Sequence, residues 1–256
     1  MPEKIAVFST VGSAVKGVAS AVVRLAPNAA FPLLTTVTLA VYREDLFEPH
    51  ELFSLAGQLY SIVAALPVAL FAFVCHRECL AELGIATSTS SSPVLPFLAW
   101  SLGAVAMFSL VDLVAPGLAF GEAGELVETD TLSIGLNSIL SIAATVTLVR
   151  CGLMLPAIVA GEPPSPRTAW RRSRGNAWRL FWASSMAPCL VVLPVLIALQ
   201  INQLLPTPGG AAIVALTPLR IAVNSAFGIA IYCATAAGAF VLCAAYAKLR
   251  GQTHAA

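Results

Sequence analysis

Charged side chains are scarce in this 256-residue sequence. Asp, Glu, Lys and Arg make up 11% of it, whereas apolar residues make up 58%. A soluble domain of this length cannot bury so much apolar side chain, so lipid must be the solvent for most of it. The formal net charge is only +1, and nucleic-acid binding needs a basic excess on one face. We therefore expect an integral membrane protein and no nucleic-acid partner.

Familiar catalytic and metal-binding motifs are also lacking. The sequence contains no G-x-S-x-G, no H-E-x-x-H and no phosphate-binding glycine loop. Cys75, His76 and Cys79 form a "C-H-x-x-C" element, but a closed zinc site needs four ligands, so we favour a helix end at the headgroups over a metal site. The six cysteines are scattered and do not indicate an extracellular disulfide framework. The sequence predicts no enzyme activity, no cofactor and no metal.

The apolar residues that are present fall into six segments, at approximately 27–42, 52–75, 95–119, 131–160, 177–205 and 211–248. A membrane span needs roughly 20 residues at a rise of about 1.5 Å each, so the first segment is marginal. We predict an all-α polytopic transmembrane helical bundle of about six spans. Thr217 and Pro218 look like the start of a helix, which places the beginning of the last helix near residue 218.

The N-terminal residues 1–26 have the pattern of an amphipathic helix. Polar and basic residues recur at helical spacing within a stripe of about 80°, namely Ser9, Ser13, Lys16, Ser20 and Arg24. A lysine in the middle of the segment argues against the uncharged core of a cleaved leader. We expect residues 1–26 to lie in the membrane interface, followed by a six-span domain over 27–250 and a tail over 251–256.

Basic residues gather in the segments on one side of the predicted membrane: Lys4, Lys16, Arg24, Arg77, Arg167, Arg171, Arg172, Arg174, Arg179, Lys248 and Arg250. The other side holds Arg43 and the acidic residues of 44–51 and 121–130. Cytoplasmic loops are the ones that carry Lys and Arg. This asymmetry predicts that both termini face the cytoplasm, which agrees with an even number of spans.

Three ionisable residues lie within apolar segments, where charge is expensive: Asp112, Arg150 and Arg220. Depth places Asp112 and Arg220 in the same leaflet, where they could form a pair. One interpretation is a substrate or proton path lined by these groups. The other, which we favour, is that each residue snorkels or pairs to fix helix packing. Coupled transporters usually show matching broken helices in two halves, and no such internal repeat is evident.

A basic hairpin at 161–179 contains most of the stretch "AWRRSRGNAWRLFW". Ser165 and Pro166 predict the cap and first turn of a short helix, Gly175 its end, and Asn176 the cap of the next span. Arginine and tryptophan together suit the headgroup region of an anionic leaflet. We predict contacts with lipid headgroups or a partner through Arg167, Trp170, Arg171, Arg172, Arg174, Trp178 and Arg179.

The segment "RCGLMLPAIVAGEPPSPRTAWRRSRGNAWRLF" resembles the signature of bacterial multi-pass families of unknown role. These are the YciC-like proteins and the membrane domain attached to some glycerophosphoryl diester phosphodiesterases. The residues that carry the resemblance are Arg150, Pro156, Glu162, Ala169, Trp170, Ser173, Gly175, Asn176, Trp178 and Arg179. "YAKLRG" at 246–251 is similar to their "Y-x-D-L-R" element, with Lys248 where an Asp is usual. The resemblance implies a fold and a bacterial inner (plasma) membrane location, but no activity.

These observations lead to two expectations for function. The first is a non-enzymatic membrane-organising or accessory protein, which holds anionic lipid of the cytoplasmic leaflet or docks a membrane-protein complex or a second copy of itself. The alternative is a transporter of a small or lipid-like solute that uses Asp112, Arg150 and Arg220.

Overall fold

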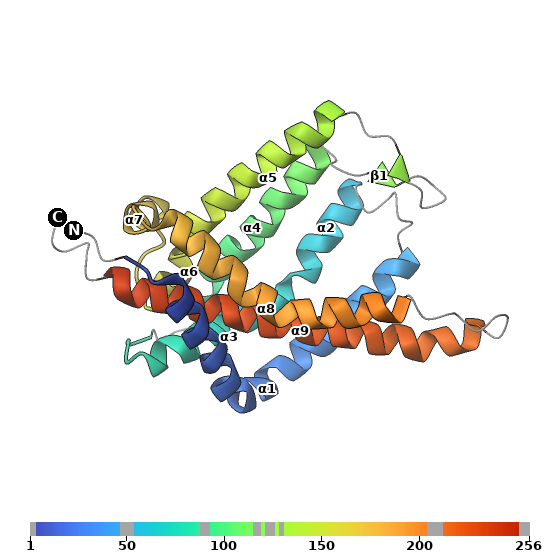
Figure 1. Ribbon diagram of the computed structural model, residues 1–256, viewed down its shortest axis with the longest axis horizontal. Helices are drawn as coiled ribbons and strands as arrows, with labels where there is room; N and C mark the ends of the chain where they lie inside the picture. The colour runs from blue at the N-terminus through green and yellow to red at the C-terminus, as the bar shows by residue number, and fades with distance from the viewer. Residues whose placement is uncertain are drawn as a thin grey trace.

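The computed structural model describes residues 4–46, 54–87, 93–114, 119–120, 126–127, 131–203 and 212–250. Nearly all of these residues are helical, which confirms the predicted all-α helical bundle. The exceptions include two short strands, β1 (Ala119–Phe120) and β2 (Leu126–Val127), which pair antiparallel. Strand β1 lies at the end of the predicted apolar segment 95–119, and β2 lies in the acidic segment 121–130. They lie at the end of the bundle where α4 and α5 meet (Figure 1).

The helices follow one another in the order α1 (Val7–Leu46), α2 (Leu55–Ala64), α3 (Leu66–Glu82), α4 (Val94–Val114), α5 (Thr131–Cys151), α6 (Met154–Val159), α7 (Pro166–Arg172), α8 (Ala177–Gln203) and α9 (Ala212–Arg250). Two of the predicted spans are each built from a pair of helices. Helix α3 begins at Leu66, just after a break at Ala65, with Pro67 in its first turn, and Gly152 and Leu153 separate α5 from α6. Proline lacks a backbone donor and so marks such interruptions.

Among the described residues, five stretches are long and apolar enough to cross a membrane: Val7–Ala40, Leu55–Glu82, Val94–Val111, Ile134–Val159 and Ser225–Arg250. The predicted fifth segment corresponds to α8, within which Ala177–Leu193 is a shorter apolar stretch. The chain is therefore a membrane-embedded helical bundle. Helices are the natural form here because lipid offers no partner for an open backbone N–H or C=O group.

The boundary expected between residues 26 and 27 does not interrupt the helix, because α1 continues through both Pro27 and Pro32. The ribbon instead changes direction between its dark blue and light blue parts (Figure 1). A proline inside a helix removes one hydrogen bond and kinks the axis without ending the helix in an apolar surrounding. In this turn the Asn28 side-chain amide donates to the Arg24 carbonyl at 3.3 Å.

The start predicted for the last helix is wrong. Helix α9 begins at Ala212 and continues through Thr217 and Pro218, so that it is 39 residues long. The sequence motif of a cap followed by proline is local, whereas lipid favours a continuous helix that satisfies its own backbone. Helices α8 and α9 run side by side along the bundle (Figure 1), with α1 and α3 packed against α9.

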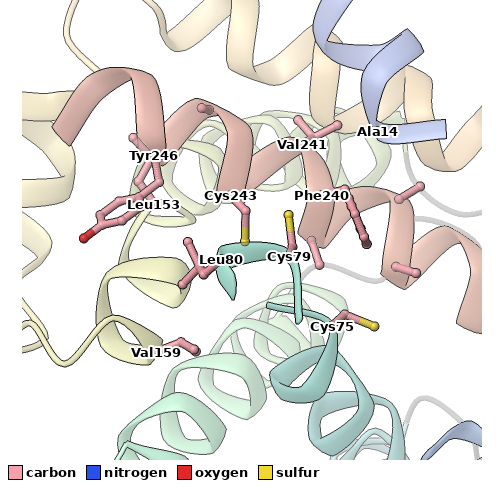
Figure 2. Close-up of a cluster of buried hydrophobic side chains, with 14 of the residues drawn as sticks. Ala14, Cys75, Cys79, Leu80, Leu153, Val159, Phe240, Val241, Cys243 and Tyr246 are labelled. Atoms are coloured by element: carbon pink, nitrogen blue, oxygen red, sulfur yellow. The ribbon is translucent and has the colours of Figure 1, made fainter. Parts of the chain in front are cut away.

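The core lies where α3 and α9 meet. Cys79 and Leu80 from α3 face Cys243 and Tyr246 from α9, whereas Val241 of α9 points toward Ala14 of α1, and all of these side chains are buried (Figure 2). The α1 backbone also approaches α9 closely, because a Cβ atom placed on Gly17 would lie 2.5 Å from the Phe240 ring. Glycine is the residue that permits such an approach.

The N-terminal half of α1 has three faces. Val11, Ala14 and Ala21 are buried against the bundle, whereas the polar stripe that contains Lys16 is exposed. The third face is apolar and exposed, as Phe8 illustrates at 80%. A helix with one packed, one apolar and one polar face suits a position between the bundle, lipid and water.

Candidate functional site

The basic hairpin (residues 161–179) is shaped by local signals that the sequence already indicated. The Ser165 hydroxyl accepts a hydrogen bond from the Thr168 N–H at 3.3 Å, and Pro166 is the first residue of α7. Gly175 has a φ of +79°, a left-handed conformation that favours glycine. Helix α8 then begins at Ala177. The predicted cap, first turn and stop of this short helix are confirmed.

Glu162 joins the hairpin to the end of the last helix. One carboxylate oxygen, Oε2, accepts from Arg172 Nη1 at 2.7 Å, and the other, Oε1, accepts from the Tyr246 hydroxyl at 2.6 Å. The Arg250 Nε lies 3.6 Å from Oε1. The side chain of Arg172 is only 8% exposed, so its charge is neutralised inside the protein and it does not lie on the outer surface.

The environment of Glu162 shifts its pKa. Burial raises the pKa of this carboxyl, but the hydrogen bonds from Arg172 and Tyr246, together with the charges of Arg172 and Arg250, lower it by more. The net pKa therefore lies below the usual value for Glu. The carboxylate is thus held ionised at neutral pH as the centre of the cluster.

Arg150 fixes the hairpin to α5. Its guanidinium stacks over the Trp170 ring with 3.6 Å from Cζ to the ring centroid, and its Nη2 donates to the Trp170 carbonyl at 3.1 Å. Its Nε donates to the Ser173 hydroxyl at 3.2 Å, and that hydroxyl donates in turn to the Trp170 carbonyl. Planar stacking combined with several donors is characteristic of arginine and is not available to lysine. This arrangement agrees with the interpretation that Arg150 fixes packing.

The N-terminal segment is attached to the other end of the hairpin. The buried side chain of Asn176 accepts from the Ile5 N–H through Oδ1 at 2.9 Å, and Arg179 Nη1 donates to the Ile5 carbonyl at 2.9 Å. Arg24 of α1 forms an ion pair with Glu82 at the end of α3. Segments that the sequence assigned to the same side of the membrane therefore meet at one end of the bundle.

The outer face of α7 differs from these anchored parts. Arg167, Arg171 and Arg174 are all exposed, and no side-chain hydrogen bond or ion pair joins any of the three to a residue that the structure describes. Trp170 beside them is 41% exposed, and Trp178 at the start of α8 is 68% exposed. Trp178 stacks on Phe181, with 5.3 Å between ring centroids, and meets Trp182 edge to face. The result is a positive surface bordered by exposed aromatic rings.

The predicted site residues therefore divide into two sets. The outer positions Arg167, Trp170, Arg171, Arg174 and Trp178 are available to a ligand, whereas the guanidinium groups of Arg172 and Arg179 are bound inside the protein. Glu162 and Tyr246 lie in the segments that carry the family resemblance, but their contact was not predicted because 84 residues separate them. The signal that could have found it is an acid placed just after one apolar segment with a Tyr and Arg at the end of another.

Asp112 lies in α4 and Arg220 in α9, but the side chains of both are outside the described part of the structure, and so is their expected pairing. Arg150 does not line either of two cavities between the helices, which have volumes of about 240 and 590 Å³.

Cys75, His76 and Cys79 are buried in the bundle core. The sulfur atoms of Cys79 and Cys243 point toward each other, whereas that of Cys75 points away (Figure 2). His76 Nδ1 lies 2.8 Å from the Ala72 carbonyl oxygen, within its own helix. Across the described ranges, no group of three or more His, Cys, Asp and Glu side chains is arranged to hold a metal ion. The helix end expected at the headgroups is thus an internal packing element.

Fold and site together define the class, a helical membrane protein with a rigidly anchored basic hairpin at one end. No protein-family model matches this sequence, and no curated protein or solved structure matches it either. The resemblance to the YciC-like families stays a prediction.

Proposed function

We propose that the protein is a non-enzymatic membrane protein of the bacterial inner membrane that binds anionic lipid headgroups at its cytoplasmic face. The observation that carries this proposal is the outer face of the hairpin, where the side chains of Arg167 and Arg171 in α7 and of Arg174 just after it are exposed and have no partner among the described residues. Arginine suits phosphate because its planar fork can donate two hydrogen bonds at once. Each cation near a negative leaflet contributes roughly 1 kcal/mol.

The anchoring of the hairpin supports a headgroup site in preference to a mobile basic loop. Glu162, Arg150 and Asn176 connect it to α9, α5 and the N-terminal segment. The outer arginines are thus held in one arrangement before any ligand binds, which lowers the entropic cost of binding. The exposed rings of Trp170 and Trp178 fit the level at which amphipathic aromatics sit in a membrane.

The orientation belongs to the same proposal. The N-terminal segment, the end of α3, the hairpin and the end of α9 are joined by the contacts described above, and the sequence concentrates Lys and Arg in these segments. The positive-inside rule then assigns this end of the bundle to the cytoplasm.

The test compares two variants with equal loss of charge. In the first variant, Arg167, Arg171 and Arg174 are all replaced by Gln. In the control variant, Gln replaces Lys4, Lys16 and Arg77, which are exposed at the same end of the bundle but lie outside the hairpin. Both proteins are purified in mild detergent with a mixture of phosphatidylglycerol and phosphatidylcholine, and bound lipid is counted by native mass spectrometry. We expect the first variant to lose most of its phosphatidylglycerol and the control to keep it. Equal retention in the two variants would overturn the proposal.

A further inference from the structure

A half-open cavity of about 240 Å³ lies between the helices, bounded by α4, α5, α6, α8 and α9. Trp100 and Ser101 of α4, Cys151 of α5 and Ser184 of α8 are part of its wall, and no lining side chain carries a charge. None of the outer arginines lines this cavity, so its ligand is distinct from the lipid headgroup proposed for the hairpin.

Two hydroxyl groups in this wall lack partners. The Oγ atoms of Ser101 and Ser184 are buried and form no hydrogen bond with any described residue. Elsewhere the helices satisfy such groups internally: Ser61, Ser138 and Thr147 each donate to the carbonyl four residues earlier, at 2.8–3.0 Å. A buried hydroxyl left unpaired costs free energy, so two of them on different helices around one cavity indicate a ligand with a hydrogen-bonding oxygen.

A groove of about 590 Å³ between α5 and α8 adjoins the cavity, and Val149 lines both. Its walls are apolar, because Thr145 donates its hydroxyl proton to the Ser141 carbonyl at 2.8 Å. The exposed ring of Trp178 forms its rim. Helices α5 and α8 diverge from the end that carries α6 and α7 (Figure 1). A hydrocarbon chain suits an apolar groove of this kind.

We propose that the cavity and groove bind a neutral single-chain lipid, whose hydroxyl or carbonyl oxygen is hydrogen-bonded by both Ser101 and Ser184 and whose chain lies along the groove. A charged end group is disfavoured, because the cavity offers no opposite charge and burying an unpaired ion is expensive. The occupant thus differs in charge from the anionic lipid proposed for the outer arginines.

The test uses tryptophan fluorescence of the full-length protein in detergent, with Trp100 as the only tryptophan and the other three replaced by Phe. The probes are 2-bromododecan-1-ol, with bromine beside the hydroxyl, and 12-bromododecan-1-ol, with bromine at the chain end. We expect saturable quenching of Trp100, stronger with the 2-bromo probe, and the reverse order in a protein that keeps only Trp178. Quenching that does not saturate, or the same order at both tryptophans, would overturn the proposal.

Serine variants test the hydrogen bonds directly. Ser101→Ala and Ser184→Ala are each expected to raise the half-saturating concentration of 2-bromododecan-1-ol about fivefold, as loss of one hydrogen bond would. Ser138→Ala, on α5 with its hydroxyl already bonded internally, is the matched control and should change nothing. In the unsubstituted cavity, dodecan-1-ol should compete with the probe whereas dodecanoate and dodecane should not. Equal competition by all three, as expected if the hydroxyls hold only water, would refute the proposal without any serine variant.

Discussion

The arginines around the basic hairpin form two groups that differ in their exposure and in their bonding partners. Arg150, Arg172 and Arg179 each donate to a named acceptor in the protein and hold the hairpin to the bundle. The arginines of the outer face, only a few positions away along the same segment, are exposed and unpaired among the described residues. Neighbouring positions on one short helix thus serve structure on one side and, we propose, ligand binding on the other.

Helical periodicity therefore predicts on which face of a helix an arginine side chain lies, but it does not predict which residue or ligand that side chain contacts. Helical spacing places Arg167, Arg171 and Arg174 within about 60° of one another on a common stripe, and the structure exposes all three. Arg172 lies on the same helix, yet its charge is cancelled by Glu162. Whether an arginine anchors the hairpin or is free to bind a ligand therefore depends on which residues the tertiary fold places next to it.

The largest effect is expected when the carboxylate of Glu162, which pairs with the buried Arg172, is removed. Glu162→Ala leaves Arg172 buried and unpaired, with its Nε already lacking a partner, and removes the acceptor of Tyr246. We expect a loss of about 2–3 kcal/mol in the free energy of unfolding, measured by thermal or denaturant unfolding in detergent. The matched control is Glu82→Ala, whose partner Arg24 is 52% exposed, and it should cost less than about 1 kcal/mol. Similar losses for both would show that the cluster does not anchor the hairpin.

The same carboxylate makes the anchored side sensitive to acid. Because the pKa of Glu162 is lower in the folded protein than its ordinary value of 4.5, its contribution to stability is fully present above about pH 4.5. The contribution disappears as pH falls through the lowered folded-state pKa. We expect the unfolding temperature to decline more steeply below pH 4.5 in the natural protein than in Glu162→Gln. Parallel pH curves for the two proteins would contradict the assignment.

Much of this architecture could be predicted from the sequence because its causes are local. The apolar segments, the cap at Ser165, and the stop at Gly175 depend on residues a few positions apart. The predicted start of α9 was wrong because it relied on the local motif of Thr217 and Pro218, whereas lipid favours a continuous helix.

The anchors of the candidate site were beyond sequence reasoning, apart from the resemblance. Ile5 and Asn176 are separated by 171 residues, and Tyr246 and Glu162 by 84. Such pairs are created by the packing of α1 and α9 on the rest of the bundle, and no periodicity along the chain encodes them.

A milder change tests the geometry of one anchor while the charge is kept. Arg150→Lys retains a cation but loses the planar group that stacks on Trp170 and donates to Ser173. We expect a loss of about 1–2 kcal/mol in unfolding free energy and a shift in Trp170 fluorescence, measured with Trp170 as the only tryptophan. Arg171→Lys, on the outer face, is the control and should leave both quantities unchanged.

The smallest effect on stability is expected from the largest change in charge. Replacing Arg167, Arg171 and Arg174 by Gln removes three cations, yet each side chain is exposed and bonded to no described residue. The unfolding free energy in neutral detergent should therefore change by no more than about 0.5 kcal/mol, although lipid retention falls. Glu162→Ala should produce the opposite pattern, with low stability but headgroup selectivity retained in the folded fraction. If the triple variant unfolded as readily as Glu162→Ala, the outer arginines would be structural and the hairpin would have no face reserved for a ligand.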